Sequence, residues 1–252
     1  MASPKRYAVV SCHVERPLDD RVWQRFAALQ RSRPGGFAIA ALIRPPDPVA
    51  GEDSGVWLAR AREAAARGPF GHHTHWTAPD HARPTGDLDP ADRVRGESAW
   101  LREQGLEPTL FCGGGWYSDR AVAEACAELG YVDCTATAYR PGYLSAGAPR
   151  LGLTAPARVV LPSGSRLLEF PSTHSLGMLA REVVAPGGLR SELVHVHFHD
   201  TDLVDQRRRL ALVWALRALA RRRHPTDLDA FASAFGAAAP EVAFKEIVTP
   251  AT

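Results

Sequence analysis

Gly71-His72-His73-Thr74-His75-Trp76 and His195-Val196-His197-Phe198-His199-Asp200 together hold six of the ten histidines of this 252-residue chain. Each stretch has the pattern of a β-strand that ends in a loop. Because side chains alternate between the two faces of a strand, His73 and His75 are expected to point the same way. In the second stretch the histidines at 195, 197 and 199 share one face, while valine and phenylalanine occupy the other. A strand of this kind lines a polar cavity.

Clustered imidazoles have two interpretations. Neutral imidazole is the commonest metal ligand, and two imidazoles two residues apart on a strand can bind one ion with nitrogens about 2.0–2.1 Å away. The alternative is a set of hydrogen-bonded core histidines, and His195, which lies deepest in its strand, fits that interpretation better. For the two clusters together we predict a metal or acid–base site.

Composition and charge are those of an ordinary globular protein, with 45% hydrophobic residues, 23% charged residues and a net charge of +2. So small a net charge attracts neither nucleic acid nor membranes, and the arginine runs 207–209 and 221–223 scatter around a helical wheel. The start of the chain has no apolar signal-peptide core, and no run of about 18 apolar residues follows. We therefore expect a cytoplasmic protein that binds neither membrane nor nucleic acid.

The four cysteines lack Cys-x-x-Cys spacing, which argues against disulfides or a zinc ribbon.

Strand-like and helix-like segments alternate along the chain. Strands are predicted at 7–12, 37–43, 70–76, 108–112, 131–134 and 191–198, with a β-hairpin at 158–170 that turns at 162–165. Helices are predicted at 19–31, 54–67, 91–104, 118–129 and 203–223, and Ser118 is a candidate N-cap of the fourth. This alternation predicts an α/β fold whose parallel sheet is closed or nearly closed, in a single domain spanning 1–252.

Residues suited to metal binding or proton transfer follow several of these strands. His13 and Glu15 follow the first strand, and His73 and His75 follow the third. The glycine-rich stretch 113–116 and the pair 199–200 follow two others. Because the carboxyl ends of parallel strands carry the chemistry of such sheets, we expect these residues to form one site.

The order of these motifs resembles that of the polysaccharide deacetylases, a family of metal-dependent N- and O-deacetylases. Those enzymes open with a strand ending in Thr-Phe-Asp-Asp-Gly, or Asp-x-Glu in divergent branches, where this chain has Ser11-Cys12-His13-Val14-Glu15. Their Gly-x-His-Thr-x-x-His string corresponds to 71–77, their arginine-bearing loop to 111–117, and their closing His-Asp or His-Pro to Phe198-His199-Asp200. The resemblance implies a distorted (β/α) barrel and a metal-dependent deacetylase activity.

Three positions depart from the family pattern. His13 stands where the family has an aspartate that binds metal or acts as base, and Cys112 replaces the loop arginine that orients the base. The second metal histidine of the family would fall at Thr77, so its role must pass to His75. A catalytically inactive relative would show such losses too. His13 and His75, however, add ligand types at the right place, which favours an active, remodelled site.

The expected centre is one divalent ion bound by His73 and His75, with His13 or Glu15 as the third ligand. We assign His13 to the metal and Glu15 to the general base, although the two share a face and the roles can be exchanged. Imidazole-rich ligation favours zinc, with cobalt, manganese or nickel as alternatives.

The remaining catalytic roles follow from position. The backbone N–H groups of Gly115 and Trp116 are expected to stabilise the oxyanion, because consecutive glycines let the backbone approach it. His199 is expected to protonate the leaving amine, with Asp200 or Asp202 holding its tautomer. Candidate substrate-binding residues are Trp76, Trp116, Tyr117 and His174. His174 follows the hairpin on a loop and could reach the site, but a surface histidine is the better interpretation.

Three functional hypotheses remain. The first is a deacetylase for a small N-acetylated, amino-sugar-like molecule, because a chain without a secretion signal is not expected to meet cell-wall polymer. The second is a related C–N hydrolase acting on a cyclic amide, formamide or ureide. The third is a non-catalytic carbohydrate- or metal-binding relative, motivated by Cys112 and Thr77. The sequence leaves open whether the protein is a homo-oligomer.

Overall fold

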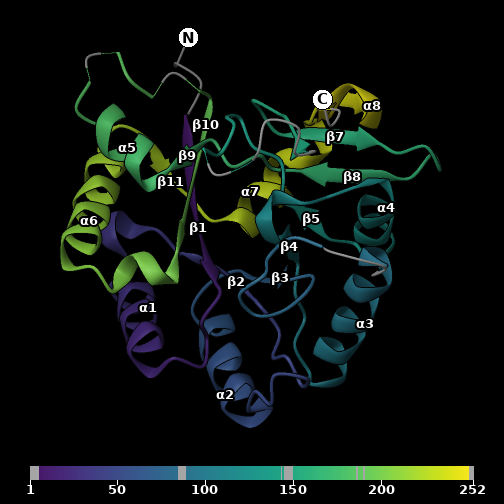
Figure 1. The fold of residues 1–252 in the computed structure, drawn as a ribbon. Helices are drawn as coiled ribbons and strands as arrows, with labels where there is room; N and C mark the ends of the chain where they lie inside the picture. Colours follow the sequence, from purple (N-terminus) through teal and green to yellow (C-terminus); the bar gives the residue numbers. More distant parts are fainter. Residues whose placement is uncertain are drawn as a thin grey trace.

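The computed structural model describes residues 6–84, 89–142, 144, 150–185, 187–189 and 191–249, which are built around a mainly parallel β-sheet (Figure 1). Its central strands are β1 (Tyr7–Val14), β2 (Ala40–Ile43), β3 (Phe70–Thr74), β4 (Leu110–Gly113), β5 (Val132–Asp133) and β10 (Leu193–His199). They lie in the spatial order β10-β1-β2-β3-β4-β5, and every neighbouring pair among them is parallel. Their carboxyl ends therefore meet at one end of the sheet.

The sheet closes into a barrel through one chain segment, 166–175. The first part of this segment, β8 (Arg166–Glu169), pairs with β5, and the last part, β9 (His174–Ser175), pairs with β10. Between them, the amide of Phe170 donates a hydrogen bond to Asp133 O at 2.7 Å. The same segment thus joins the two edges of the parallel sheet.

Shorter strands extend and distort this barrel. β7 (Ala157–Val160) forms an antiparallel hairpin with β8, and β12 (Glu241–Ala243) adds to its outer edge. The hairpin turns at 162–165 as predicted, where Leu161 N donates to Ser165 O at 2.9 Å. The remaining strands are β11 (His224–Pro225), which pairs with β1, and the antiparallel pair β6 (Arg150–Leu151) and β13 (Val248–Thr249).

Helices cover the outside of the barrel. They are α1 (Asp20–Ser32), α2 (Ser54–Ala65), α3 (Pro90–Glu103), α4 (Arg120–Glu128), α5 (Leu176–Glu182), α6 (Gln206–Ala220), α7 (Leu228–Phe235) and α8 (Phe244–Ile247). Figure 1 shows α6, α1, α2, α3 and α4 in an arc around the sheet. Within the described chain no helix is both long and apolar enough to cross a membrane.

The predicted N-cap of α4 is wrong. Asp119, not Ser118, caps this helix, because its carboxylate accepts a hydrogen bond from Val122 N at 2.9 Å. Serine and aspartate are about equally good N-caps, so residue type alone could not decide between two neighbours. Aspartate is the cap that this chain uses repeatedly, at Asp19, Asp53, Asp89, Asp119, Asp205 and Asp227.

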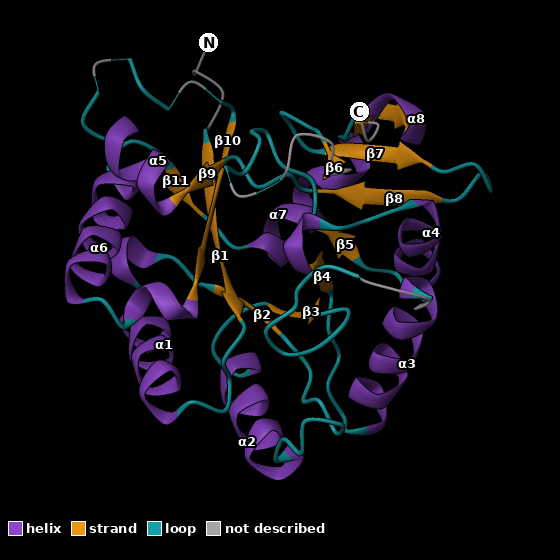
Figure 2. Cartoon of the chain, in the orientation of Figure 1, coloured by secondary structure: helices purple, strands orange, loops and turns teal. Residues whose placement is uncertain are grey.

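The two faces of β1 pack against different cores. One face, with Val10 and Cys12, packs against the outer helices, whereas Val9 belongs to an inner core that also contains Leu228 and Phe231 of α7. The ring of Phe231 lies 5.8 Å from that of Tyr7, at the start of β1. α7 therefore fills the amino end of the barrel (Figure 2) and leaves the carboxyl end for the polar residues.

The prediction of an α/β fold with a distorted (β/α) barrel is confirmed. All five predicted helices and all six predicted strands are present, with ends that differ by a few residues. The sequence pattern did not predict α5, α7 or α8, which are too short for a clear apolar periodicity.

Candidate metal centre

The carboxyl ends of β1 and β3 bring three candidate ligands together. Oε1 of Glu15 lies 3.8 Å from Nε2 of His73 and 3.6 Å from Nε2 of His75. Both imidazoles are buried, and the Glu15 side chain is 28% exposed at the rim. Two nitrogens and one carboxylate oxygen at these separations can converge on one divalent ion.

Hydrogen bonds fix the tautomer of both imidazoles. Nδ1 of His73 donates to Cys112 O at 2.8 Å, and Nδ1 of His75 donates to Pro79 O at 2.6 Å. Because the proton is on Nδ1, each Nε2 carries a lone pair. Both Nε2 atoms are buried and have no hydrogen-bond partner among the described residues. Metal-binding histidines have this arrangement, in which one ring nitrogen is held by the protein and the other is presented to the ion.

The charges at this site fit cation binding. Burial raises the pKa of Glu15, but its contacts with His73 and His75 outweigh that effect and hold the pKa well below its ordinary value. Burial lowers the pKa of His73 to about 4, so its ring is neutral at pH 7. The centre thus combines one carboxylate with the neutral imidazole of His73.

A second ligand set overlaps the first. Ligand atoms of His13, His73 and Cys112 also lie within 4.8 Å of one another. The His13 ring packs 4.7 Å from that of His73, and its Nε2 is likewise buried without a partner in the described chain. Burial raises the pKa of the Cys112 thiol well above its ordinary value, so the thiolate that a metal needs is disfavoured. The set that contains Glu15 is the better one.

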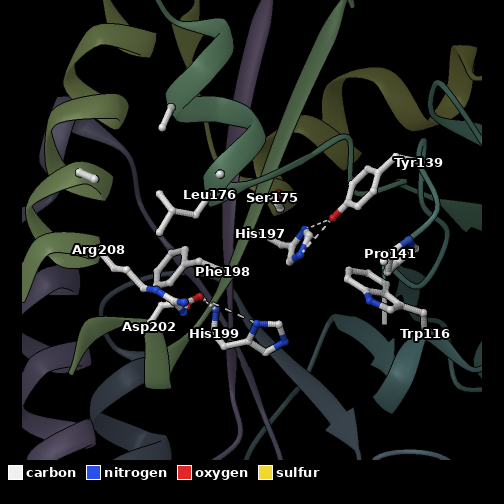
Figure 3. Close-up of a pocket in the computed structure, with 14 residues that line it drawn as sticks. Trp116, Tyr139, Pro141, Ser175, Leu176, His197, Phe198, His199, Asp202 and Arg208 are labelled. Atoms are coloured by element: carbon white, nitrogen blue, oxygen red, sulfur yellow. Dashed lines mark hydrogen bonds and ion pairs between the residues drawn. The ribbon is translucent and has the colours of Figure 1, made fainter. Parts of the chain in front are cut away.

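Two adjoining cavities open at this end of the barrel. The smaller, of about 140 Å³, is lined by His13, Glu15, His73, Ala82, Gly113, Gly115, Trp116 and His199. The larger, of about 520 Å³, shares Trp116 and His199 with it. Figure 3 shows Tyr139, Pro141 and Trp116 on one side of the larger cavity, and Leu176, Phe198 and Arg208 on the other. A ligand in the larger cavity can therefore extend one group toward the candidate metal ligands.

His199 stands where the two cavities meet. Its Nε2 lies 3.6 Å from Oε1 of Glu15, and its Nδ1 lies 4.0 Å from Oδ2 of Asp202. Of the two carboxylates expected to hold the His199 tautomer, Asp202 is therefore the one that lies near the ring. Asp200 instead accepts hydrogen bonds from the backbone N–H groups of Arg16 (2.9 Å) and Thr201 (2.8 Å), and burial raises its pKa to about 6.

The glycine-rich loop brings Gly115 and Trp116 to the smaller cavity, as the oxyanion assignment requires. Both residues have a φ of +58°, which Trp116 adopts against the usual preference of a side-chain-bearing residue. The loop is also tightly packed, since a Cβ atom on Gly113 would lie 2.0 Å from Tyr117 O. The glycines thus permit a close turn that places the Trp116 ring between the cavities.

Three predicted substrate-binding residues line neither of these cavities. Trp76 is fully buried, and its Nε1 donates to Gly114 O at 3.0 Å. This hydrogen bond stabilises the glycine-rich loop. Tyr117 donates to Asp119 at 2.8 Å. His174 lines a separate cavity of about 400 Å³, and its Nε2 lies 3.1 Å from Glu182. We leave all three out of the substrate site; Trp116 remains in it.

The other histidines of β10 differ from one another. His195 is buried, with its ring nitrogens near Ser11 Oγ (2.9 Å) and Phe170 O (3.3 Å), so it is the core histidine expected. His197 faces the larger cavity, where its ring nitrogens lie 3.2 and 3.3 Å from the hydroxyl of Tyr139. The sequence pattern does not indicate Tyr139 as a site residue, because it lies in a loop with no periodic signal.

No protein-family model and no curated protein matches this chain. Among solved structures, the 4-α-glucanotransferase from Thermococcus litoralis aligns with a TM-score of 0.55 and 12% identity, over 91% of this chain. This chain spans only 38% of that enzyme. A protein from Bordetella bronchiseptica, named as a polysaccharide deacetylase involved in O-antigen biosynthesis, aligns with a TM-score of 0.49 and 12% identity over 86% of this chain and 90% of its own.

A family 4 carbohydrate esterase from Streptomyces lividans, solved with acetate, aligns with a TM-score of 0.46 and 10% identity over 86% of both chains. At these identities the likeness concerns the fold alone. The activity of this chain has to be argued from its own residues.

Proposed function

We propose that this protein is a metal-dependent hydrolase that removes an acetyl group from a small, N-acetylated, amino-sugar-like substrate. The observation that carries the proposal is the convergence of Nε2 of His73, Nε2 of His75 and Oε1 of Glu15. Leaving a buried acceptor without a partner costs about 1–3 kcal/mol, and both imidazoles have one. A bound cation offsets that cost at both nitrogens together.

The donor set indicates the kind of ion. Two imidazole nitrogens and one carboxylate oxygen suit zinc or a neighbouring transition metal better than magnesium or calcium. Three protein ligands also leave a coordination position open, as catalytic zinc sites do. When bound, such an ion supplies Lewis-acid activation of water and of the scissile carbonyl.

The residues around the ligands supply the proton transfers in this proposal. Because Glu15 is a ligand in this proposal, His13 takes the role of the base. His13 lines the same cavity, and its Nε2 has no hydrogen-bond partner among the described residues. His199, at the boundary with the larger cavity, donates a proton to the leaving amine. Asp202, whose carboxylate also accepts the backbone N–H of His199 at 3.1 Å, holds the ring. Gly115 and Trp116 line the same cavity, and their backbone N–H groups would stabilise the oxyanion.

The larger cavity supports a sugar-like substrate. Its volume of about 520 Å³ falls in the range of small-molecule sites. Its lining combines apolar surfaces from Trp116, Leu176 and Phe198 with polar groups from Tyr139 and Asp202. Such a lining suits a ring with an apolar face and hydroxyl groups at its edge.

The test is product analysis with the metal-loaded protein. Incubation with a panel of N-acetylated amino sugars, formamides and cyclic amides should release acetate from at least one amino sugar. His73→Ala should abolish the release, while His224→Ala, an exposed histidine in β11 at the amino end of the barrel, should not. Formate or a ring-opened acid as the product would replace deacetylation with the related C–N hydrolysis. A metal-loaded protein that releases nothing from the panel would favour the non-catalytic alternative.

A further inference from the structure

Two carboxylic acids are buried side by side near the glycine-rich loop, outside the mechanism described above. Asp133 of β5 and Glu169 of β8 are paired in register, and both are fully buried. Burial and the neighbouring Asp133 raise the pKa of Glu169 well above its ordinary value. Burial also raises the pKa of Asp133, but hydrogen bonds from Thr135 and Glu169 oppose this effect. Oδ2 of Asp133 and Oε2 of Glu169 are both buried and have no hydrogen-bond partner among the described residues, so a single proton on Glu169 would serve both carboxyl groups.

The hydroxyl of Thr135 connects this pair to the glycine-rich loop. It donates to Oδ1 of Asp133 at 2.5 Å and accepts a hydrogen bond from Gly113 N at 2.8 Å. The amide of Thr135 donates to the same carboxylate oxygen at 2.8 Å. The hydroxyl proton is therefore directed to Asp133, and its oxygen is directed to Gly113.

The peptide group bonded to Thr135 also holds a candidate metal ligand. Gly113 N and Cys112 O belong to one planar peptide group, and Cys112 O accepts the Nδ1 proton of His73 at 2.8 Å. An unbroken series of hydrogen bonds thus runs from Asp133 through Thr135 and this peptide group to His73. Its far end is the buried Nε2 of His73.

We propose that Asp133 and Thr135 are positioning residues that orient His73 and strengthen it as a metal ligand through this single peptide group, an inference that rests on the metal centre of the proposed function. Linked hydrogen bonds polarise one another. The hydrogen bond from the Thr135 hydroxyl to the Asp133 carboxyl group makes the Thr135 oxygen a better acceptor. This polarises the peptide group and strengthens the hydrogen bond that its carbonyl accepts from Nδ1 of His73. A stronger bond at Nδ1 raises the basicity of Nε2 and fixes the ring plane.

The test is cobalt titration of Thr135→Val, a substitution that keeps the shape and removes the hydroxyl. Thr109→Val is the matched control, because the Thr109 hydroxyl also donates to an aspartate carboxylate, that of Asp229, at 2.7 Å. Thr135→Ser restores the hydroxyl, and Asp133→Asn removes the charge while keeping the side-chain size. Cobalt affinity and the visible absorption spectrum of the bound ion are measured, together with the thermal unfolding midpoint of each apoprotein.

Loss of the hydrogen-bond partner of a metal ligand typically weakens metal binding by about 10–100-fold. Because Asp133 and Thr135 act on His73 through the intervening peptide group, we expect a smaller loss of about 3- to 10-fold. Thr135→Val and Asp133→Asn should show this loss and an altered spectrum, whereas Thr135→Ser and Thr109→Val should match the wild type. If Thr135→Val does not fold, Asp133→Asn decides. Wild-type affinity and spectrum in both variants would overturn the inference and leave the metal centre intact. A wild-type protein that binds no cobalt would overturn the metal centre and the inference together.

Discussion

Oε1 of Glu15 lies 3.6 Å from Nε2 of His75, although the strands that carry these residues are separated by β2. Glu15 follows the last residue of β1, and His75 follows the last residue of β3, so both side chains reach over the rim of the barrel. His13, two residues earlier, lies deeper and is only 3% exposed. In our proposal Glu15 is the third ligand at the rim, and His13 is the group that transfers the proton.

His199→Ala should retain metal and lose turnover. In our proposal His199 donates a proton to the leaving group and binds no ion, and general acids contribute about 10²–10⁴-fold to the rate. Metal content by elemental analysis and kcat on the best amino-sugar substrate check this. Loss of the metal in this variant would place His199 among the ligands, in place of the acid role.

Gly113→Ala should destabilise the protein, and Gly96→Ala should not. A Cβ atom on Gly113 would meet Tyr117 O at 2.0 Å, while one on Gly96 meets nothing within 4 Å. Gly96 lies inside α3, where alanine is favoured over glycine by about 0.5–1 kcal/mol. We expect a loss of about 2 kcal/mol or more for Gly113→Ala and a small gain for Gly96→Ala. Urea denaturation of the two variants measures both, and equal stabilities would show that the loop tolerates a side chain.

Glu169→Gln should change how stability depends on pH. Because burial raises the pKa of Glu169 in the folded protein, the unfolded chain releases this proton at lower pH than the folded one does. The contribution of Glu169 is therefore fully present below the ordinary glutamate pKa of about 4.3 and is lost as pH rises through the folded value. The difference in the free energy of unfolding, wild type minus Glu169→Gln, should decrease as the pH is raised from 4.5 to 8.

The control for this measurement is Glu192→Gln, at an exposed position. It should show no comparable trend across the same pH range. A flat difference for Glu169→Gln would mean that the Asp133–Glu169 pair does not hold a proton of its own in the folded protein.

Much of this arrangement could be predicted from the order of residues. The two-residue period of a strand placed His73 and His75 on one face, and the alternation of strands and helices placed their loop at one end of the sheet. His72, which precedes His73, correspondingly points to the other face, where its Nε2 lies 2.7 Å from Glu97. These features depend on local geometry, which the sequence determines directly.

Other features depend on contacts that local patterns do not encode. Barrel closure by 166–175 requires one segment to leave β5 and join β10, and β9 has only two residues. Asp133 and Glu169 are 36 positions apart and meet only through strand register. His13 and Glu15 share a face, so periodicity could not rank them as third ligand and base.

Metal titration of Glu15→Ala and His13→Ala, side by side with the wild type, tests the central claim most directly. The wild type should bind about one zinc or cobalt ion per chain by calorimetry and elemental analysis. Glu15→Ala should lose most of this affinity, because it removes the carboxylate between two ligand nitrogens. His13→Ala should keep the ion and lose turnover. A wild type without a bound ion would contradict the account, and normal binding by Glu15→Ala with none by His13→Ala would show that His13 is the third ligand.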